Sequence, residues 1–332
     1  MLAAWYERTG PARDVLKLGE LPDPVAAPGD VVVRMYASGV NPSDTKHRGG
    51  WRGWTMPFAR IVPHSDGAGI IAAVGAGVSP SRQGERVWVY NATALYDASR
   101  GLGTAAALCA VPAAQAIGLP DAVSFDVGAC FGIPACTAHR AVFAEGEVSG
   151  QTLLVQGAAG AVGQYCVQMA KLGGADVIGT VSSPEKAAVA AHAGADIVID
   201  RKREDVIARV MALTAGRGVD RIIEVDLGAN LAIDVPLIKA NGTIASYSST
   251  AAPEPVFPYY PLAFKGVTLR LVQGFNLPPA ARAAAIADIT AWSSTGQLRH
   301  AIAARFPLAE IAAAHELLES GRAIGNIVVE IP

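Results

Sequence analysis

The 332-residue sequence predicts an α/β protein with two domains: an irregular, β-rich domain and a doubly wound, parallel-sheet domain of about six strands. The chain is long for a single hydrophobic core. Its first part is rich in Gly and Pro, whereas short apolar runs alternate with helix-compatible segments from about residue 123. Hydrophobic residues make up 51% of the chain and charged residues 17%. These fractions favour a well-buried protein over a disordered one.

Residues 1–122 contain short strand patterns separated by turn signals. The clearest runs are GDVVVRMYASGV (29–40) and GERVWVYNA (84–92), and Pro28-Gly29-Asp30 is a typical turn sequence. We therefore expect an irregular β domain over this part of the chain.

Six apolar runs of strand length follow, and helix-compatible segments separate them. Near-continuous apolar strands alternating with helices are typical of a parallel sheet covered on both faces. The runs are LLVQ (153–156), DVIGTV (176–181), ADIVID (195–200), DRIIEV (220–225), GTIASYS (242–248) and GVTLRLV (266–272). Beyond about residue 275 we expect two helices, at 278–293 and 308–320, and a final strand within 325–332.

Composition limits the partners and the compartment. A formal net charge of −2 gives no reason to expect nucleic acid or an anionic membrane surface. Glu7 and Arg8 interrupt the place where a signal peptide needs an apolar stretch, and no apolar run approaches the ~18 residues of a membrane span. We expect a soluble, cytoplasmic protein. The four dispersed cysteines, expected to be buried thiols, are Cys109, Cys130, Cys136 and Cys166.

The stretch LLVQGAAGAVGQ (153–164) resembles a phosphate-binding turn. It reads Ala158-x-Gly160-x-x-Gly163, with the last two glycines of the dinucleotide fingerprint kept and the first replaced by alanine. A strand precedes it and a helix follows, so free N–H groups and the helix dipole would meet phosphate oxygens. The alternative is a Gly-rich turn that binds nothing. The expected pyrophosphate site consists of Ala158, Ala159, Gly160, Ala161, Val162 and Gly163.

The end of the second parallel strand predicts which dinucleotide is bound. Asp176 has the spacing of a ribose-binding carboxylate, but it lies at the wrong end of its strand. At the carboxyl end stand Ser182 and Ser183, with Lys186 shortly after and Arg201 beyond the third strand. Hydroxyls with nearby cations suit a 2′-phosphate, so we expect NADPH rather than NADH. Solvated surface charge is the alternative interpretation of the two cations.

Four motifs in order along the chain resemble the medium-chain dehydrogenases/reductases, and within them the zinc-independent, zeta-crystallin-like quinone oxidoreductases. They are GVNPSDTKHRGG (39–50), PHSDGAGIIAAVGAGV (63–78), IPACTAHRAVF (133–143) and GAAGAVGQ (157–164). The resemblance implies a GroES-like catalytic domain (1–122 and 275–332) around a Rossmann domain (123–274). It also implies NADPH and a homodimer paired through the sixth strand, VTLRLV (267–272).

The zinc ligands of related alcohol dehydrogenases are not matched here. Asn41 stands where those enzymes have Cys, and Ser65 stands where they have His. An amide and a hydroxyl are poor zinc ligands, and His64 is one residue out of register. We expect no metal. Without a Lewis acid, reduction of an already electrophilic acceptor is favoured over alcohol oxidation.

The resemblance also suggests roles for individual residues. It places Asn41 near the substrate carbonyl, where its amide would donate to an oxyanion, and Thr137 beside the nicotinamide. Asp44 is expected to organise its own loop, or alternatively to act in catalysis. Lys46 stands where relatives often have Tyr, and either stabilises an anion or points into solvent. Residues of the loops 246–249 and 273–276 are expected at the nicotinamide end: Ser246, Tyr247 and Phe275.

Aromatic residues are candidates for the walls of a substrate pocket. Trp51 and Trp54 follow the Asn41 motif, while Tyr90 and Tyr96 follow a strand end. They would stack on a planar quinone, or alternatively they anchor their loops against the domain. Of these, Trp54 and Tyr90 are the preferred substrate contacts.

Three functions remain open from the sequence. The favoured one is NADPH-dependent reduction of quinones. The second is reduction of the C=C bond of enals, enones or enoyl thioesters, for which Arg48, Arg52 and Arg60 would offer a basic patch to coenzyme A phosphates. The third is a crystallin-like protein that binds NADPH without turnover.

Overall fold

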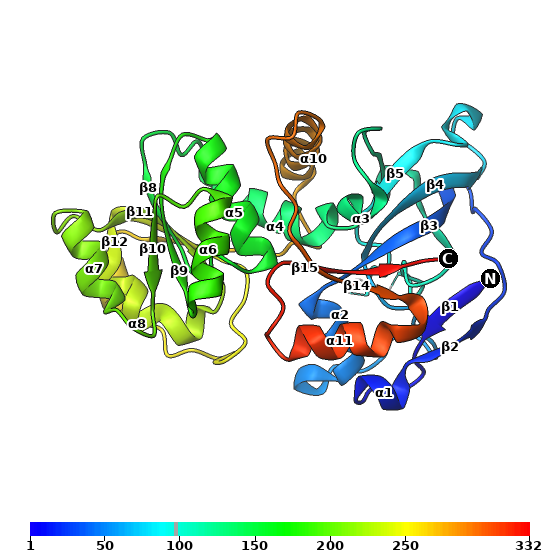
Figure 1. The fold of residues 1–332 in the computed structure, drawn as a ribbon, viewed down its shortest axis with the longest axis horizontal. Coiled ribbons are helices and arrows are strands. Elements are labelled where there is room, and N and C mark those ends of the chain that lie inside the picture. Colours follow the sequence, from blue (N-terminus) through cyan, green and yellow to red (C-terminus); the bar gives the residue numbers. More distant parts are fainter. Residues whose placement is uncertain (96–98) are drawn as a thin grey trace. The chain divides into compact units, whose positions relative to one another are not determined.

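A computed structural model describes residues 1–95 and 99–332. The chain divides into two compact units, shown in Figure 1. Unit 1 comprises Met1–Pro134 and Ile286–Pro332, and unit 2 comprises Ala135–Ala285. These divisions fall later in the chain than the positions expected from sequence, after residues 122 and 274.

Unit 1 is built on a mixed sheet. The strand order is β14 (Ile302–Pro307), β15 (Asn326–Glu330), β3 (Asp30–Val40), β4 (Asp66–Val74), β5 (Arg86–Val89) and β7 (Ala116–Gly118), and β6 (Leu108–Pro112) also pairs with β3. β14 runs parallel to β15, and the other pairs are antiparallel. β1 (Leu2–Trp5) and β2 (Lys17–Glu20) form a separate antiparallel pair. The sequence patterns did not predict β14.

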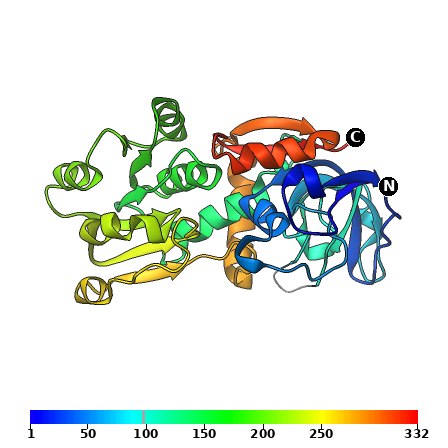
Figure 2. The same cartoon turned by 90° about the horizontal axis from the view of Figure 1, so that it is seen from below.

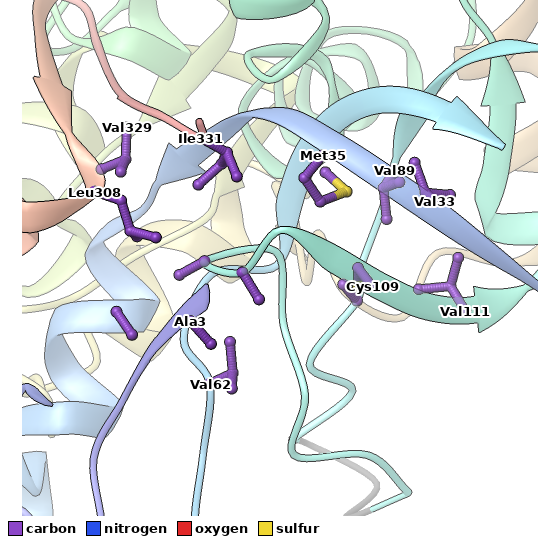
Figure 3. Close-up of a cluster of buried hydrophobic side chains, with 14 of the residues drawn as sticks. Ala3, Val33, Met35, Val62, Val89, Cys109, Val111, Leu308, Val329 and Ile331 are labelled. Atoms are coloured by element: carbon purple, nitrogen blue, oxygen red, sulfur yellow. The ribbon is translucent and has the colours of Figure 1, made fainter. Parts of the chain in front are cut away.

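The core of unit 1 gathers apolar side chains from distant parts of the chain. Figure 3 shows Ala3, Met35, Cys109, Leu308 and Val329 in one buried cluster. Helix α11 (Ile311–Glu319) packs beside β14, as Figure 2 shows in red and orange. Helix α2 (Pro42–Gly49) begins directly after β3, so the end of that strand fixes the position of its first turn.

Unit 2 is a doubly wound Rossmann fold. Its six strands are all parallel, in the order β10 (Ile197–Asp200), β9 (Asp176–Val181), β8 (Thr152–Val155), β11 (Val219–Glu224), β12 (Ile238–Ser246) and β13 (Thr268–Leu271). All six expected strands form. The order reverses between β8 and β11, which is the switch point where such sheets bind ligands at their carboxyl ends.

Helices cover both faces of this sheet. In Figure 1, α5 (Ala161–Leu172) and α6 (Pro184–Ala193) lie on one side, and α7 (Val206–Leu213) and α8 (Leu227–Leu237) lie on the other. The apolar runs therefore pack on two faces, which explains why they do not alternate with polar residues. The remaining helices are α1 (Ala12–Val15), α3 (Phe125–Gly128), α4 (Cys136–Phe143), α9 (Tyr259–Phe264) and α10 (Pro279–Ser294).

Two expectations about composition can be compared with the fold. All four cysteines are buried thiols, as expected. Within residues 1–95 and 99–332, no helix combines the length and apolar character needed to span a bilayer.

Candidate active site

The glycine turn connects β8 to α5 in unit 2. Gly157 adopts a φ of 69°, so it is this residue that supplies the left-handed conformation of the tight turn. Ala158, at the first fingerprint position, is fully buried. It fits because Gly179 of β9 faces it: a Cβ on Gly179 would lie 2.8 Å from the Ala158 methyl. A glycine on the neighbouring strand thus compensates for the missing fingerprint glycine.

The other two fingerprint glycines have different surroundings. A Cβ on Gly163 would lie 2.2 Å from the Gly157 carbonyl oxygen, so close packing of helix on turn requires glycine there. A Cβ on Gly160 would meet nothing closer than 3.4 Å, and this residue is exposed at the N-terminus of α5. The space beside Gly160 suits the approach of phosphate oxygens to the helix N-terminus.

The carboxyl end of β9 holds the hydroxyl and basic residues selected for the ribose end. Asp176 is the first residue of β9, at the opposite end of the strand. The Ser183 hydroxyl caps α6 by accepting from the Lys186 N–H at 3.3 Å. The Arg201 N–H donates to the Val181 carbonyl at 3.0 Å, which holds the loop after β10 against the end of β9.

Two charged residues that the sequence analysis did not consider belong to the same region. Glu185 hydrogen-bonds to the Ser183 side chain, and this bond lowers the pKa of the exposed Glu185 carboxyl; Arg203 lowers it further. The ribose end therefore contains a carboxylate as well as Lys186 and Arg201.

The residues expected at the nicotinamide end have mixed exposure. Thr137 on α4 and Ser246 at the end of β12 are nearly fully buried, and the Ser246 hydroxyl donates to the Ser248 carbonyl at 3.0 Å. Burial raises the pKa of Tyr247, and the neighbouring Cys166 and Glu224 raise it further. Phe275 is half-buried.

A buried polar network below the glycine turn was missed. Three of its members, Thr180, Asp234 and Glu224, lie on β9, α8 and β11. Gln156 directly follows β8, and all four side chains are at most 3% exposed. Nothing in the spacing of these residues along the chain connects them. Of these four residues, only Glu224 could have been noticed in the sequence, as a charged residue within an apolar strand.

In unit 1, Asn41 lies between two buried carboxyl groups. Its Nδ2 donates to Asp66 Oδ2 at 2.7 Å, and its backbone N–H donates to Asp44 Oδ2 at 2.7 Å. Asp44 also accepts from the His64 N–H. It thus organises the start of α2 in the expected way.

Burial dominates the electrostatics of these two acids. It raises the pKa of Asp66 to about 7, although hydrogen bonds from Asn41 and the Ile133 N–H act in the opposite direction. Burial also raises the pKa of Asp44, and the nearby Asp66 raises it further. Asp66 Oδ1 is buried and accepts no hydrogen bond from the described residues. A Cβ on Gly132 would lie 2.0 Å from that oxygen, so Gly132 is required beside it.

The residues at the zinc positions of related enzymes are held in other interactions. The Ser65 hydroxyl pairs with the Thr93 hydroxyl at 2.9 Å. His64 lies between Ser38 Oγ, 2.7 Å from its Nδ1, and His315 Nε2, 2.9 Å from its Nε2. Burial lowers the pKa of His64 to about 3. Both ring nitrogens of His64 are thus engaged, and this donor set does not fit a zinc ion. The described residues hold no group of three or more metal-ligating side chains.

The remaining candidates of unit 1 occupy loops and core positions. The Lys46 ammonium lies 4.7 Å from the centre of the Trp51 ring, a cation–π contact. Trp54 packs against a small apolar cluster and its ring centre lies 4.7 Å from that of His47. Tyr90 is 2% exposed, which is typical of a loop anchor. Tyr96 lies outside the described residues.

A cavity of about 510 Å³ in unit 1 does not coincide with the candidate residues. It is lined by Tyr36, Arg86, Phe125, Asp126 and Glu330, among others. Two of the arginines considered for coenzyme A are also engaged elsewhere. Arg48 is 1% exposed and pairs with Glu319, whereas both Nε and Nη2 of Arg60 bind Glu7.

Comparison with known families agrees with this architecture. Residues 27–121 match the alcohol dehydrogenase GroES-like domain, and residues 161–290 match the domain described as zinc-binding dehydrogenase. Together with the Rossmann topology, these matches define the class: the chain is a medium-chain dehydrogenase/reductase.

Relatives place it more narrowly. The human quinone oxidoreductase is 30% identical over 98% of this chain and 95% of its own length. The Escherichia coli quinone oxidoreductase, solved with NADPH, is 25% identical with a TM-score of 0.88 over 99% of this chain and 100% of its own. A mycobacterial protein complexed with NADPH is 28% identical, with a TM-score of 0.86 over 99% of both chains. The chain belongs to the quinone oxidoreductase branch of the family.

Proposed function

We propose that this protein is an NADPH-dependent, zinc-independent reductase that transfers a hydride to quinones. The observation that carries the proposal is the β8–α5 turn of a quinone oxidoreductase-type Rossmann unit, with hydroxyls and cations at the end of β9. NADPH supplies the hydride when it is bound. The residues of this chain bind the cofactor and stabilise the reduced acceptor.

The turn fits the pyrophosphate of a dinucleotide. Gly160 leaves room for close approach, and the free N–H groups of the first turn of α5 point outward from the helix. At the ribose end, Ser182, Lys186 and Arg201 favour a 2′-phosphate, while Glu185 opposes it. We attribute the preference for NADPH to the cations, because a charged hydrogen bond to phosphate is stronger than a neutral one.

The donor set of unit 1 supports reduction of an electrophilic acceptor. Asn41 and Ser65 are poor zinc ligands and are already hydrogen-bonded within unit 1. A quinone needs no metal activation, because the incoming charge delocalises onto its oxygens. We assign Asn41 the role of stabilising that oxyanion through its side-chain amide, and Asp66 the role of orienting the amide.

The edge of the parallel sheet supports a homodimer. β13 is an edge strand, and Leu271 at its end is 70% exposed. Phe264 and Tyr260 on the preceding helix are 85% and 67% exposed. Unpaired edge strands with exposed apolar side chains are prone to pair with a second chain. Light scattering of the full chain should give twice the monomer mass, and Leu271→Glu should reduce it.

Two of the three arginines considered for a coenzyme A substrate are engaged within unit 1, and Arg52 is the exposed third. Arg48 is buried in an ion pair with Glu319, and Arg60 is bound to Glu7. Neither offers its charge to coenzyme A phosphates. Enals, enones and enoyl thioesters remain the alternative class of acceptor.

An acceptor panel tests the proposal. Anaerobic oxidation of NADPH and NADH would be followed at the nicotinamide absorbance band with benzoquinone, phenanthrenequinone, an enal and crotonyl-coenzyme A. We expect turnover with NADPH and a quinone. Turnover with the enal alone, giving the saturated aldehyde, would establish C=C reduction. Tight NADPH binding without any turnover would favour the crystallin-like alternative or an acceptor outside the panel.

A further inference from the structure

A chain of hydrogen bonds in unit 2 links two carboxyl groups to the glycine turn. The Gly157 N–H donates to Thr180 Oγ1 at 3.2 Å, and the Ala158 N–H donates to the Thr180 carbonyl at 3.0 Å. The Thr180 hydroxyl donates to Gln156 Oε1 at 2.6 Å. Gln156 Nε2 then donates to Asp234 Oδ1 at 3.0 Å.

The direction of each bond in this chain is fixed. A hydroxyl has a single hydrogen, which Thr180 gives to Gln156. The amide oxygen of Gln156 is therefore occupied as an acceptor, and its NH₂ group faces Asp234. In this arrangement Asp234 Oδ1 accepts from Gln156.

The second oxygen of Asp234 faces a carboxyl group rather than a donor. The Asp234 and Glu224 carboxyl groups are close enough for each to act on the pKa of the other. Glu224 Oε1 accepts from the Asp226 N–H and from Asn230 Nδ2. Asp234 Oδ2 and Glu224 Oε2 receive no N–H or O–H donor from the rest of the described chain. A hydrogen bond between two carboxyl groups requires one proton between them.

The surroundings of the pair retain that proton. Both residues are fully buried, and burial raises the pKa of each. The other titratable groups facing them are the Asp226 carboxyl on α8 and the Tyr247 hydroxyl after β12, with the Cys166 thiol of α5 beside Tyr247. No cation from the described part of the chain acts on either carboxyl. Glu224 accepts two N–H donors and Asp234 accepts one, so Asp234 is the protonated member.

We propose that Asp234 and Glu224 share one proton and, through Gln156 and Thr180, position the Gly157 amide and the glycine turn for the phosphates of the dinucleotide. The four side chains are positioning residues, which do not touch the cofactor. Loss of the proton would place two adjacent negative charges below a turn that must accept phosphate. The inference rests on the proposed NADPH site, and it adds a cause for pH-dependent cofactor affinity.

Titration of NADPH binding against pH tests the inference in the full chain. The wild-type Kd should be constant near neutral pH and rise at least about 10-fold at alkaline pH. In Asp234→Asn, the amide keeps both hydrogen bonds and cannot ionise. Its Kd should stay within about 2-fold of wild type at pH 7 and lose the alkaline rise. The same alkaline rise in Asp234→Asn as in wild type would overturn the proposal.

A second pair of variants tests the link to the turn. Thr180→Val removes the acceptor for the Gly157 N–H and should raise the Kd about 5–10-fold, the equivalent of one hydrogen bond. Thr180→Ser restores the hydroxyl and should return the Kd to within about 2-fold of wild type. Equal affinities of the two variants would contradict the positioning role. Asp220→Asn, at the amino end of β11, is the matched control and should keep the wild-type pH profile.

An infrared measurement separates this inference from the proposed function. The difference spectrum of wild type minus Asp234→Asn, without NADPH, should show the band of a protonated carboxylic acid at pH 7. Its absence would refute the shared proton even in a protein that binds NADPH. Absence of NADPH binding to wild type would refute the proposed function, and with it the positioning role.

Discussion

Both units bury two acidic residues below the groups expected to meet ligand, but they neutralise them differently. In unit 1, Asp44 and Asp66 each accept N–H donors from Asn41. In unit 2, Asp234 and Glu224 each keep one buried oxygen without an N–H or O–H donor from the described residues. Both pairs accept N–H donors, which lower the cost of burying a carboxyl group, and we propose that the pair in unit 2 also shares one proton. In unit 1 the pair orients a side chain, whereas in unit 2 it orients a backbone turn.

The largest effect on stability and NADPH binding is expected in unit 2, from Gly163→Ala. Its Cβ would lie 2.2 Å from the Gly157 carbonyl oxygen and push α5 off the turn. We expect a loss of about 2–3 kcal/mol in unfolding free energy and loss of NADPH binding. Denaturant unfolding and a binding titration measure the two effects.

Gly160→Ala is the matched variant for this test. Its Cβ has only the 3.4 Å contact with the Gly157 oxygen, so the fold should keep its stability. NADPH should still bind at least about 10-fold more weakly, because the methyl group occupies the phosphate approach. Wild-type NADPH affinity in Gly163→Ala would show that the turn does not bind the cofactor.

The corresponding test substitution in unit 1 is Asn41→Ala. Removing the oxyanion donor should lower kcat for quinone reduction about 100-fold and leave the Kd for NADPH within about 2-fold. Ser65→Ala is the control, because it removes only the hydrogen bond to Thr93. An unchanged kcat in Asn41→Ala would assign the oxyanion contact to another residue.

Asp66→Asn tests the raised pKa of Asp66 through the pH dependence of the unfolding free energy. The pKa of Asp66 rises from 3.8 to about 7 on folding. The folded state therefore binds more protons between these values, and the unfolding free energy contributed by Asp66 falls as pH rises through this range. The unfolding free energy of Asp66→Asn, relative to that of wild type, should therefore increase by about 2 kcal/mol from pH 5 to pH 7. Parallel stability curves for the two proteins would contradict the raised pKa.

A smaller effect concerns cofactor choice at the end of β9. Arg201→Ala should weaken NADPH binding about 10-fold, equivalent to one charged hydrogen bond, and leave NADH affinity unchanged. Lys202→Ala, the exposed neighbouring cation, should change neither. Equal losses for NADPH and NADH in Arg201→Ala would show that Arg201 does not contact the 2′-phosphate.

The smallest effect is expected at Lys46. Its ammonium on helix α2 contacts the ring of Trp51, which follows the helix. Lys46→Met should cost about 0.5–1 kcal/mol of stability and change kcat by no more than about 2-fold. A much larger fall in kcat would establish that Lys46 stabilises an anion or donates a proton.

Local patterns predicted the parallel sheet and the turn because residues close together in the chain determine both. The six apolar runs each became a strand, and the order Gly160-x-x-Gly163 fixed the start of α5. Compensation of Ala158 by Gly179 was not visible, because the two glycine positions meet only after β8 and β9 pair. The Asp234–Glu224 pair and the His64–His315 contact were missed for the same reason.

Exposure was the other quantity that the sequence could not supply. Arg48 and Tyr90 lie in segments with many polar or small residues, yet both are almost fully buried. Their burial depends on residues far along the chain, such as Glu319 for Arg48. The sequence therefore shows which aromatic and basic residues lie near a motif. Whether their side chains face solvent depends on tertiary packing.

Hydride transfer to a quinone is tested most directly by a single-turnover reaction of the preformed NADPH complex with phenanthrenequinone under anaerobic conditions. We expect the nicotinamide absorbance to decay at a rate that rises with quinone concentration, with one NADPH consumed per quinone. Unchanged absorbance, with NADPH still bound, would contradict a quinone reductase.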